Sequence, residues 1–309
     1  MFVSGWCRTA ALAAALLACL APAAGCGGGK AKKKPTLTIA ERLKRAEAEK
    51  TPEAKAREYV KVARLQLKSG DRAGATKTAE AARKALPEGA DPVRLVEVGG
   101  LFAEIGERKP AKETLDRAVK AAAEVADPVT RTRVLSEVGG IFGAALGDAA
   151  AAKKTLAEAE KSAAAAEERF RGVALAAVAS GYSEAGLAKD AGKMVATLEA
   201  SARGLEEPRP KAEALAAAAK VRYQNGDTDE AAGLLKEAEE AAKGISGAEN
   251  RTYALVAVAT AWNACGDQGA AKKLVKEAEK SAEKVPDPEQ QKAAKEKVRL
   301  LQVAVDRKR

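Results

Sequence analysis

Residues 210–243 read PKAEALAAAAKVRYQNGDTDEAAGLLKEAEEAAK, and they decide the fold. The stretch before Gly226 is rich in alanine and has no proline after its start. The stretch after it has apolar residues at helical spacing, namely Ala231, Leu234, Leu235, Ala238 and Ala242. Gly226 can adopt the positive φ that ends a helix, and Asp227 can cap the helix that follows. The sequence therefore predicts a hairpin of two helices, 210–225 and 228–243.

This hairpin pattern occurs six times along the chain. Its turn glycines stand at intervals of 36, 41, 39, 40 and 40 residues, at Gly70, Gly106, Gly147, Gly186, Gly226 and Gly266. An alanine follows each of them by five positions, at Ala75, Ala111, Ala152, Ala191, Ala231 and Ala271. Self-similarity at a fixed period of about 20–50 residues is typical of repeat arrays, in which each unit buries its apolar face against its neighbours. The chain is therefore predicted to be a repeat array with a binding surface.

A second signal separates one hairpin from the next. It is an acidic residue followed by proline, at Asp91-Pro92, Asp127-Pro128, Glu207-Pro208 and Asp287-Pro288. The acidic side chain can cap the incoming helix, and proline is tolerated at the first helical position because its missing N–H costs nothing there. Thr38 and Glu41 have the spacing of a capping box and predict a further helix before the first hairpin.

Positions counted back from each turn glycine carry a family resemblance. Position −7 is small, with Ala63, Gly99, Ala179, Ala219 and Ala259, and Gly139 is its equivalent in one longer repeat. Position −4 is mostly larger, with Gln66, Phe102, Tyr182, Arg222 and Trp262. Together with the alanines after the turns, this resembles the tetratricopeptide (TPR) pattern W-x2-L-G-x2-Y…A-x3-F over residues 53–285.

The resemblance implies an all-α, right-handed solenoid of α-hairpins with about six helix-turn-helix repeats and capping helices at both ends. The period is near 40 residues rather than about 34, which predicts longer second helices; another α-hairpin solenoid, such as HEAT-type repeats, stays open as the alternative. The predicted segments are a signal peptide at 1–25, a flexible basic tether at 26–35, an N-terminal helix at 36–52, six repeats at 53–288 and a capping helix at 289–309.

The first residues resemble a bacterial lipoprotein signal. An apolar run at 10–20, too short to span a bilayer as a helix, leads into Ala23-Ala24-Gly25-Cys26, although the family usually has leucine where Ala23 stands. The resemblance implies an exported protein anchored in a membrane by a lipidated Cys26, with its folded domain in the periplasm or outside the cell. The alternative is ordinary cleavage after Ala23 or Ala24, which would release a soluble product. The lysines of the tether either attract anionic headgroups or form a solvated spacer.

The net charge of +10 belongs to the ends of the chain. Residues 30–50 contribute +5 and residues 289–309 contribute +4, whereas 51–288 holds 37 basic and 37 acidic residues. A nucleic-acid-binding stripe would need a basic excess along the repeats, so the sequence argues against nucleic acid as a partner.

The sequence offers little for catalysis. It has no histidine, which removes the commonest general base and metal ligand, and it has no glycine-rich phosphate loop. We expect no enzyme activity, no cofactor and no metal site. Outside residues 1–26 the only cysteine is Cys265, so stability must come from helix packing rather than from an internal disulfide. One cation recurs near the start of the first helices, at Lys55, Arg131, Arg171, Lys211 and Arg251, and either pairs with acidic residues of the neighbouring repeat or contacts a ligand.

The resemblance implies that the first helices line a concave groove, with exposed side chains at positions −13, −6, −3 and −2. The groove candidates are Arg57, Arg64, Lys68, Ser180, Ser183, Glu184, Lys220, Tyr223, Gln224, Tyr253, Thr260 and Asn263. We expect a membrane-tethered scaffold that binds a protein or peptide in this groove. The alternative is a carrier that holds a small molecule or glycan there. The sequence leaves the partner and the oligomeric state undetermined.

Overall fold

The computed structural model describes residues 37–307, and the helices lie in the second of two compact units, Thr38–Arg309. These residues form fourteen α-helices and no strand. The helices are α1 (Ile39–Glu47), α2 (Pro52–Lys68), α3 (Arg72–Ala85), α4 (Pro92–Ile105), α5 (Arg108–Ala123), α6 (Pro128–Ala144), α7 (Ala149–Ala164), α8 (Glu168–Glu184), α9 (Ala188–Gly204), α10 (Pro208–Gln224), α11 (Thr228–Lys243), α12 (Ala248–Ala264), α13 (Gln268–Ala282) and α14 (Pro288–Asp306). The predicted segments 1–25 and 26–35, with Cys26, lie outside the described residues.

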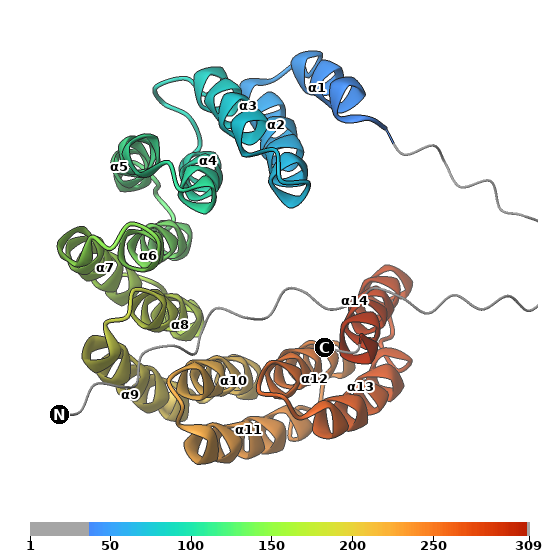
Figure 1. The fold of residues 1–309 in the computed structure, drawn as a ribbon. Helices are drawn as coiled ribbons and strands as arrows, with labels where there is room; N and C mark the ends of the chain where they lie inside the picture. The colour runs from blue at the N-terminus through green and yellow to red at the C-terminus, as the bar shows by residue number, and fades with distance from the viewer. Residues whose placement is uncertain (1–36, 308–309) are drawn as a thin grey trace, which may run out of the picture. The chain divides into compact units, whose positions relative to one another are not determined.

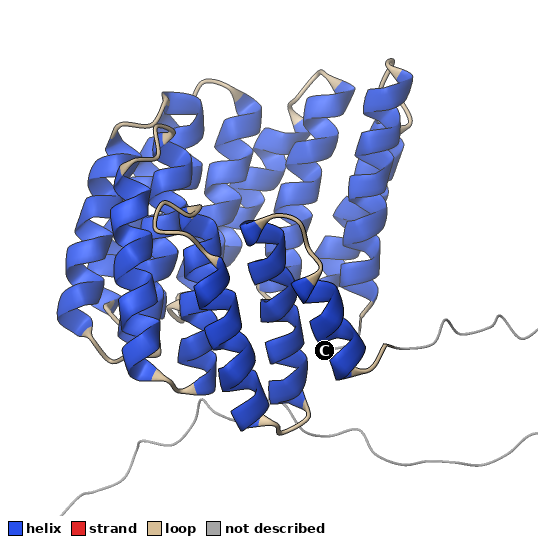
Figure 2. Ribbon diagram, turned by 90° about the horizontal axis from the view of Figure 1, so that it is seen from above, coloured by secondary structure: helices blue, strands red, loops and turns tan. Residues whose placement is uncertain are grey.

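The helices from α2 to α13 form six hairpins, each with an even-numbered first helix and an odd-numbered second helix. Each first helix packs beside the first helices of the neighbouring hairpins, and each second helix packs on its own first helix and on the next one. The even-numbered helices therefore line the inner side of the array and the odd-numbered helices its outer side (Figure 1). Seen from above, the helices stand side by side with the loops at their ends (Figure 2). The chain is an all-α helical-repeat solenoid, as predicted.

The six turn glycines have the predicted left-handed backbone. Their φ values lie between 60° and 95°, a region that a residue with a Cβ atom adopts only with strain. Asp71, Asp148 and Asp267 then cap the second helices by accepting backbone N–H groups at 2.8–3.0 Å. The predicted cap at Asp227 is wrong in its chemistry. Asp227 is at the N-cap position, but its carboxylate accepts a hydrogen bond from Arg222 Nη1 at 3.1 Å and caps no backbone N–H.

The caps of the first helices follow the prediction at most positions. Asp91, Asp127 and Asp287 accept backbone N–H groups of the helices that begin at the next proline. Glu207 makes no such bond, because the longer side chain of glutamate is a poorer N-cap. Before the first hairpin, Thr38 and Glu41 form the predicted capping box, in which Thr38 N donates to Glu41 Oε2 at 2.8 Å.

The core of each hairpin forms where a large residue packs on a small one. The alanines five positions after the turn glycines are all buried. A Cβ atom on Gly139 would lie 2.5 Å from Cγ of Leu156, and one on Gly99 would lie 2.8 Å from Cγ of Leu115. In these two repeats, glycine at the −7 position leaves the space that a leucine of the second helix fills.

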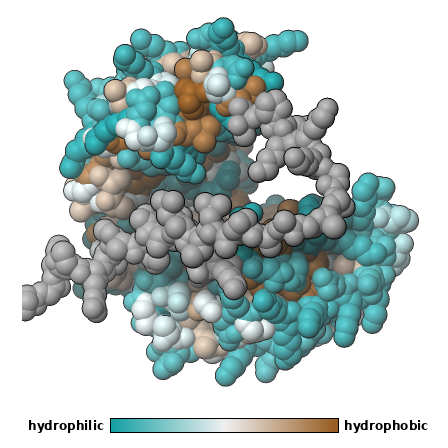
Figure 3. All heavy atoms as spheres, turned by 45° about the vertical axis from the view of Figure 1, so that its right-hand side comes forward, coloured by the Kyte–Doolittle hydropathy of each residue, from teal (hydrophilic) through white to brown (hydrophobic). Residues whose placement is uncertain are grey.

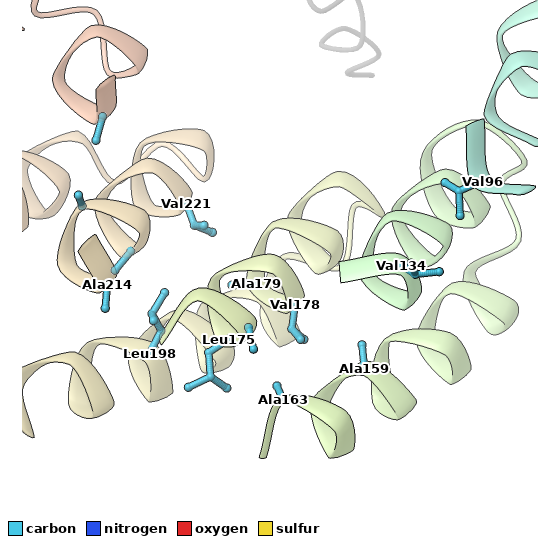
Figure 4. Close-up of a cluster of buried hydrophobic side chains, with 14 of the residues drawn as sticks. Val96, Val134, Ala159, Ala163, Leu175, Val178, Ala179, Leu198, Ala214 and Val221 are labelled. Carbon is cyan, nitrogen blue, oxygen red and sulfur yellow. The ribbon is translucent and has the colours of Figure 1, made fainter. Parts of the chain in front are cut away.

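The core also joins neighbouring hairpins. Leu175, Val178 and Ala179 of α8 are buried between residues of α7, such as Ala163, and Leu198 of α9 (Figure 4). Each first helix thus shares its apolar side chains with the second helix of the preceding repeat as well as with its own, which is the packing expected of a solenoid.

The longer period is not carried by the second helices alone. The second helices have 14–17 residues, and so do the first helices α2 to α12. The residues beyond the usual repeat length are therefore shared by both helices of a hairpin. Among residues 37–307 no helix is both long and apolar enough to cross a membrane.

Candidate functional site

The inner face is the surface formed by the exposed side chains of the first helices and of α14. All twelve groove candidates lie on first helices, three each on α2, α8, α10 and α12, and each is at least partly exposed. None lies on α4, α6 or α14, although these helices also contribute to the inner face. Its chemistry changes along the array, from basic at α2 through acidic at α4 to α8 to apolar side chains and unpaired lysines at α10 to α14.

The basic part is one face of α2. Arg57, Lys61, Arg64 and Lys68 are spaced by four, three and four residues, which places them on one side of the helix, and all four are exposed. Arg64 forms a two-point contact with Glu104 of α4, with its Nη2 at 2.8 Å and its Nε at 3.2 Å from the two carboxylate oxygens. Lys68 has no ion-pair partner among residues 37–307. This contact ties the first hairpin to the second across the inner face.

The acidic part consists of Glu97 on α4, Glu137 on α6 and Glu184 on α8. Burial is the main cause that raises the pKa of Glu137, and the charge of Glu97 raises it further, while Arg133 and Arg64 lower it. Burial also raises the pKa of Glu184, and the charge of Glu137 adds to the effect with no cation nearby to oppose it. Glu137 is therefore close enough to both Glu97 and Glu184 for like charges to repel.

A glycine makes room for this cluster. A Cβ atom on Gly140 of α6 would lie 2.7 Å from Glu184 Oε2, so the carboxylate of α8 occupies the space that a side chain would take. Glu184 is among the groove candidates predicted from the sequence, but Glu97 and Glu137 are not, because they do not stand at positions −13, −6, −3 or −2. Both missed residues are nine or ten positions before their turn glycine, one helical turn from position −6, and this periodicity was the available signal.

The remaining part is formed by α10, α12 and α14 and combines exposed apolar and aromatic side chains with lysines that have no partner among the described residues. Tyr223 is exposed on α10, and Tyr253 on α12 lies under the guanidinium of Arg209, 5.0 Å from the ring centre. Thr260 donates to Val256 O at 2.7 Å, and the side-chain oxygen of Asn263 is buried with no donor among the described residues.

The other candidates differ in how far they are engaged. Ser183 of α8 donates to Asn225 Oδ1 at 2.7 Å, at the end of α10. Ser180 is half-buried, whereas Lys220 and Gln224 are exposed and have no hydrogen-bond or ion-pair partner among residues 37–307. Side chains without partners can be used for binding at no cost to the fold.

Helix α14 extends the inner face and was predicted only as a cap. Its Ala294, Val298, Leu301 and Val305 are buried, as a cap requires. In contrast, Leu300 is 55% exposed and Val303 is 44% exposed. Figure 3 shows hydrophobic residues, in brown, at the surface of the protein among hydrophilic residues, in teal.

The recurring cation has a structural role that neither sequence hypothesis foresaw. Arg131 Nε donates to Val125 O at 2.9 Å, Arg251 Nε donates to Ile245 O at 2.6 Å, and Arg171 and Lys211 reach Ala166 O and Arg203 O. Each cation thus binds a carbonyl at the end of the preceding second helix, where the helix dipole is negative and the carbonyls lack partners. Lys55 makes no such contact. These residues hold neighbouring repeats together rather than pairing with carboxylates.

Two other features of the described residues belong to the fold. A shallow pocket is lined by Arg108, Lys112 and the start of α7, but Lys112 contacts Asp148 at 2.8 Å and Arg108 donates to Leu146 O, so both cations already have hydrogen-bond partners in the fold. No group of three or more Cys, Asp or Glu side chains in residues 37–307 is arranged to hold a metal ion. The half-buried Cys265 is at the C-cap of α12.

No known protein family and no curated protein matches the chain. Among solved structures it is similar to Ton1535 from Thermococcus onnurineus NA1, with 13% identity, a TM-score of 0.38 and coverage of 83% of this chain and 94% of the other. It is also similar to a Rap protein complexed with Competence and Sporulation Factor, with 12% identity, a TM-score of 0.37 and coverage of 85% of this chain and 79% of the other. For the TPR-like repeats of a putative kinesin light chain from Podosopora anserina, the identity is 17%, the TM-score is 0.30 and the coverage is 84% of this chain and 100% of the other. The chain has a TPR-like helical-repeat fold, and this assignment rests on its own hairpins.

Proposed function

We propose that this protein is a non-enzymatic scaffold that binds a protein or peptide partner on its inner face. The observation that carries the proposal is the continuity of this face. Neighbouring first helices present exposed side chains in register from α2 to α14, and lysines such as Lys68 and Lys220 have no partner within the described residues. An extended surface of this kind fits an extended or helical polypeptide.

The shape of the surface favours a polypeptide over a small molecule. A site for a small ligand is typically a concave pocket that buries most of the ligand. The pocket at Arg108 and Lys112 lies at the turn before α7 and is shallow, and its lining includes none of the twelve groove candidates. A small-molecule or glycan carrier therefore remains the second candidate without a specific observation in its favour.

The binding proposal can be tested by site-specific photo-crosslinking in the cells that make the protein. A photoreactive amino acid at Thr260 on the inner face should give reproducible adducts with another protein. The same amino acid at Lys236, an exposed residue of α11 on the outer side, is the matched control and should not give them. Adducts at Lys236 alone, or none at inner-face positions on α2, α8 and α12, would contradict the proposal.

We also propose that the protein is exported and anchored in a membrane by lipidated Cys26, with the repeats in the periplasm or outside the cell. The support is the Ala24-Gly25-Cys26 sequence after an apolar run, followed by a stretch rich in glycine and lysine. Cys26→Ser should move the protein from the membrane fraction to the soluble fraction. A variant that stays in the membrane fraction after this substitution would overturn the anchoring proposal and leave the binding proposal untouched.

A further inference from the structure

The last three inner-face helices are in register at a spacing of 40 residues. Lys220, Thr260 and Leu300 occupy one position on α10, α12 and α14, and Tyr223, Asn263 and Val303 occupy the position one turn further on. Helix α12 packs between α10 and α14, so each set forms a row that crosses the three helices. The two rows define the C-terminal surface. Its apolar members are Tyr223, Leu300 and Val303.

The exposure of Leu300 and Val303 is not needed to close the array. Helix α14 already covers the last hairpin with its other face, through Ala294, Val298, Leu301 and Val305. A helix that only capped the array would carry polar residues at the two exposed positions, since terminal repeats need a polar outer side for solubility. Leu300 and Val303 are one helical turn apart on α14 and form an exposed apolar strip, which indicates a surface that is covered by something else.

The charges around the C-terminal surface define the chemistry of what covers it. Glu213 of α10 and Glu296 of α14 are compensated, because Glu213 contacts Arg209 Nε at 2.9 Å and Glu296 contacts Arg299 Nη2 at 2.7 Å. Two lysines are not compensated. Lys220 on α10 and Lys297 on α14 are exposed, on either side of α12, and neither forms an ion pair or hydrogen bond with residues 37–307. The unpaired charge at the margins of the C-terminal surface is therefore positive.

We propose that the C-terminal surface binds an acidic, amphipathic segment of the partner protein, with apolar side chains against Tyr223, Leu300 and Val303 and carboxylates toward Lys220 and Lys297. This inference rests on the proposed function and names the partner's chemistry. With about 10 Å between neighbouring helix axes, α10 and α14 are about 20 Å apart. A helical segment of about 13 residues spans that distance, and hydrophobic contact combined with flanking charge supplies both affinity and orientation.

The experiment uses the full chain and two displayed libraries of helical peptides of about 14 residues. One library combines Leu and Val with Asp and Glu, and the other combines Leu and Val with Lys and Arg. The best binders of each are then measured by fluorescence polarisation against the wild-type protein and its variants. Peptides from the acidic library should bind, and Leu300→Asp or the double variant Lys220→Glu/Lys297→Glu should weaken their binding by about tenfold or more.

Two control variants keep the loss of binding specific. Val173→Asp changes an apolar residue of similar exposure on α8, outside the C-terminal surface. Lys236→Glu/Lys276→Glu reverses two exposed, unpaired lysines on the outer helices α11 and α13. Both controls should bind the acidic peptides as the wild type does, which separates contact at the surface from a change in net charge or solubility.

Three results would overturn the inference. The first is enrichment of basic peptides only. The second is acidic peptides whose affinity is unchanged by Leu300→Asp and by the lysine reversal. The third is no peptide binding at all, including the case in which the protein binds phosphatidylglycerol vesicles instead and Leu300→Asp abolishes that binding. None of them refutes the proposed function, which is tested separately by crosslinking at Thr260. Crosslinked partners together with any of these results would mean that the inner face binds a polypeptide of different chemistry.

Discussion

At the scale of single residues, glycine has two different tasks in this protein. The turn glycines supply positive φ, and all six have it. The glycines inside first helices, such as Gly99 and Gly139, supply space for a leucine of the second helix. Glycine in the interior of a helix destabilises the protein by roughly 1 kcal/mol relative to alanine. Close packing of the leucine offsets this loss at Gly99 and Gly139.

Gly139→Ala should therefore destabilise the protein although alanine is the better helix former. Its Cβ atom would lie 2.5 Å from Leu156 Cγ in a core where Leu156 is fully buried, so either the leucine or α7 must move. We expect a loss of about 1–3 kcal/mol in the free energy of unfolding, measured by urea denaturation.

The control for this substitution is Gly233→Ala. Gly233 lies in the middle of α11, and a Cβ atom there has nothing within 4 Å. Helix propensity alone then acts, and the variant should gain about 0.5–1 kcal/mol. Equal effects of the two substitutions would show that the contact with Leu156 is not what selects glycine at position 139.

At the scale of helices, neighbouring repeats are joined by polar contacts as well as by the core. Arg131 and Arg251 bind the ends of the preceding second helices. On another face, Tyr182 donates to Glu160 and Arg222 donates to Glu199 at 2.7 Å, linking position −4 of a first helix to the second helix before it. The contact between α6 and α8 differs, since it brings the like charges of Glu137 and Glu184 together.

The burial of Glu184, with the charge of Glu137 beside it, gives a pH-dependent stability. Because the folded state raises the pKa of Glu184 above its ordinary value of 4.5, the folded protein holds more protons than the unfolded chain over the range between the two values. The free energy of unfolding must then fall as pH rises through that range. Glu184→Gln removes the charge, so we expect a higher melting temperature at pH 7 and a smaller difference between pH 7 and pH 4.5. An equal pH dependence in the variant and the wild type would contradict this, and Glu279→Gln, at an exposed glutamate of α13 without an ion pair, is the control.

At the scale of the whole array, each repeat depends on its neighbours, so the ends are the weak points. Helix α1 covers the first hairpin, and α14 covers the last one with four buried side chains. The charges follow the same division. The repeats are neutral as a group, whereas the segments at both ends are basic. Within this neutral array the inner face still separates charge, with cations on α2 and carboxylates on α4, α6 and α8.

Removal of residues 287–309 should make the last hairpin the least stable part of the protein. Leu274 and Val275 of α13 are fully buried in the intact array, and the loss of α14 exposes the face of the last hairpin that it covers. We expect faster amide hydrogen exchange in α12 and α13 and increased binding of a hydrophobic dye, with α2 to α7 unchanged. Uniformly faster exchange along the whole chain would instead indicate that the array unfolds as a single unit.

Most of the architecture was predictable from the sequence, because it depends on local rules. A glycine after a helix, an acidic residue before a proline and a small residue at a fixed offset each act within one hairpin, and their repetition along the chain fixed the number of hairpins. The groove candidates lie on first helices for the same reason. Glu97 and Glu137 were missed, because the proximity of Glu137 to Glu97 and to Glu184 depends on how three helices from different repeats pack together.

The sequence by itself thus determined the helices, their turns and their order, since these depend on backbone preferences and on spacing within about 40 residues. Only the tertiary structure decided what the polar residues do. In the folded protein Arg131 and Arg251 donate hydrogen bonds to backbone carbonyls, and Asp227 accepts one from Arg222. Leu300 is exposed although its neighbour Leu301 is buried. These outcomes depend on which partner lies within reach across a repeat boundary, and long polar side chains reach several partners that the sequence cannot rank.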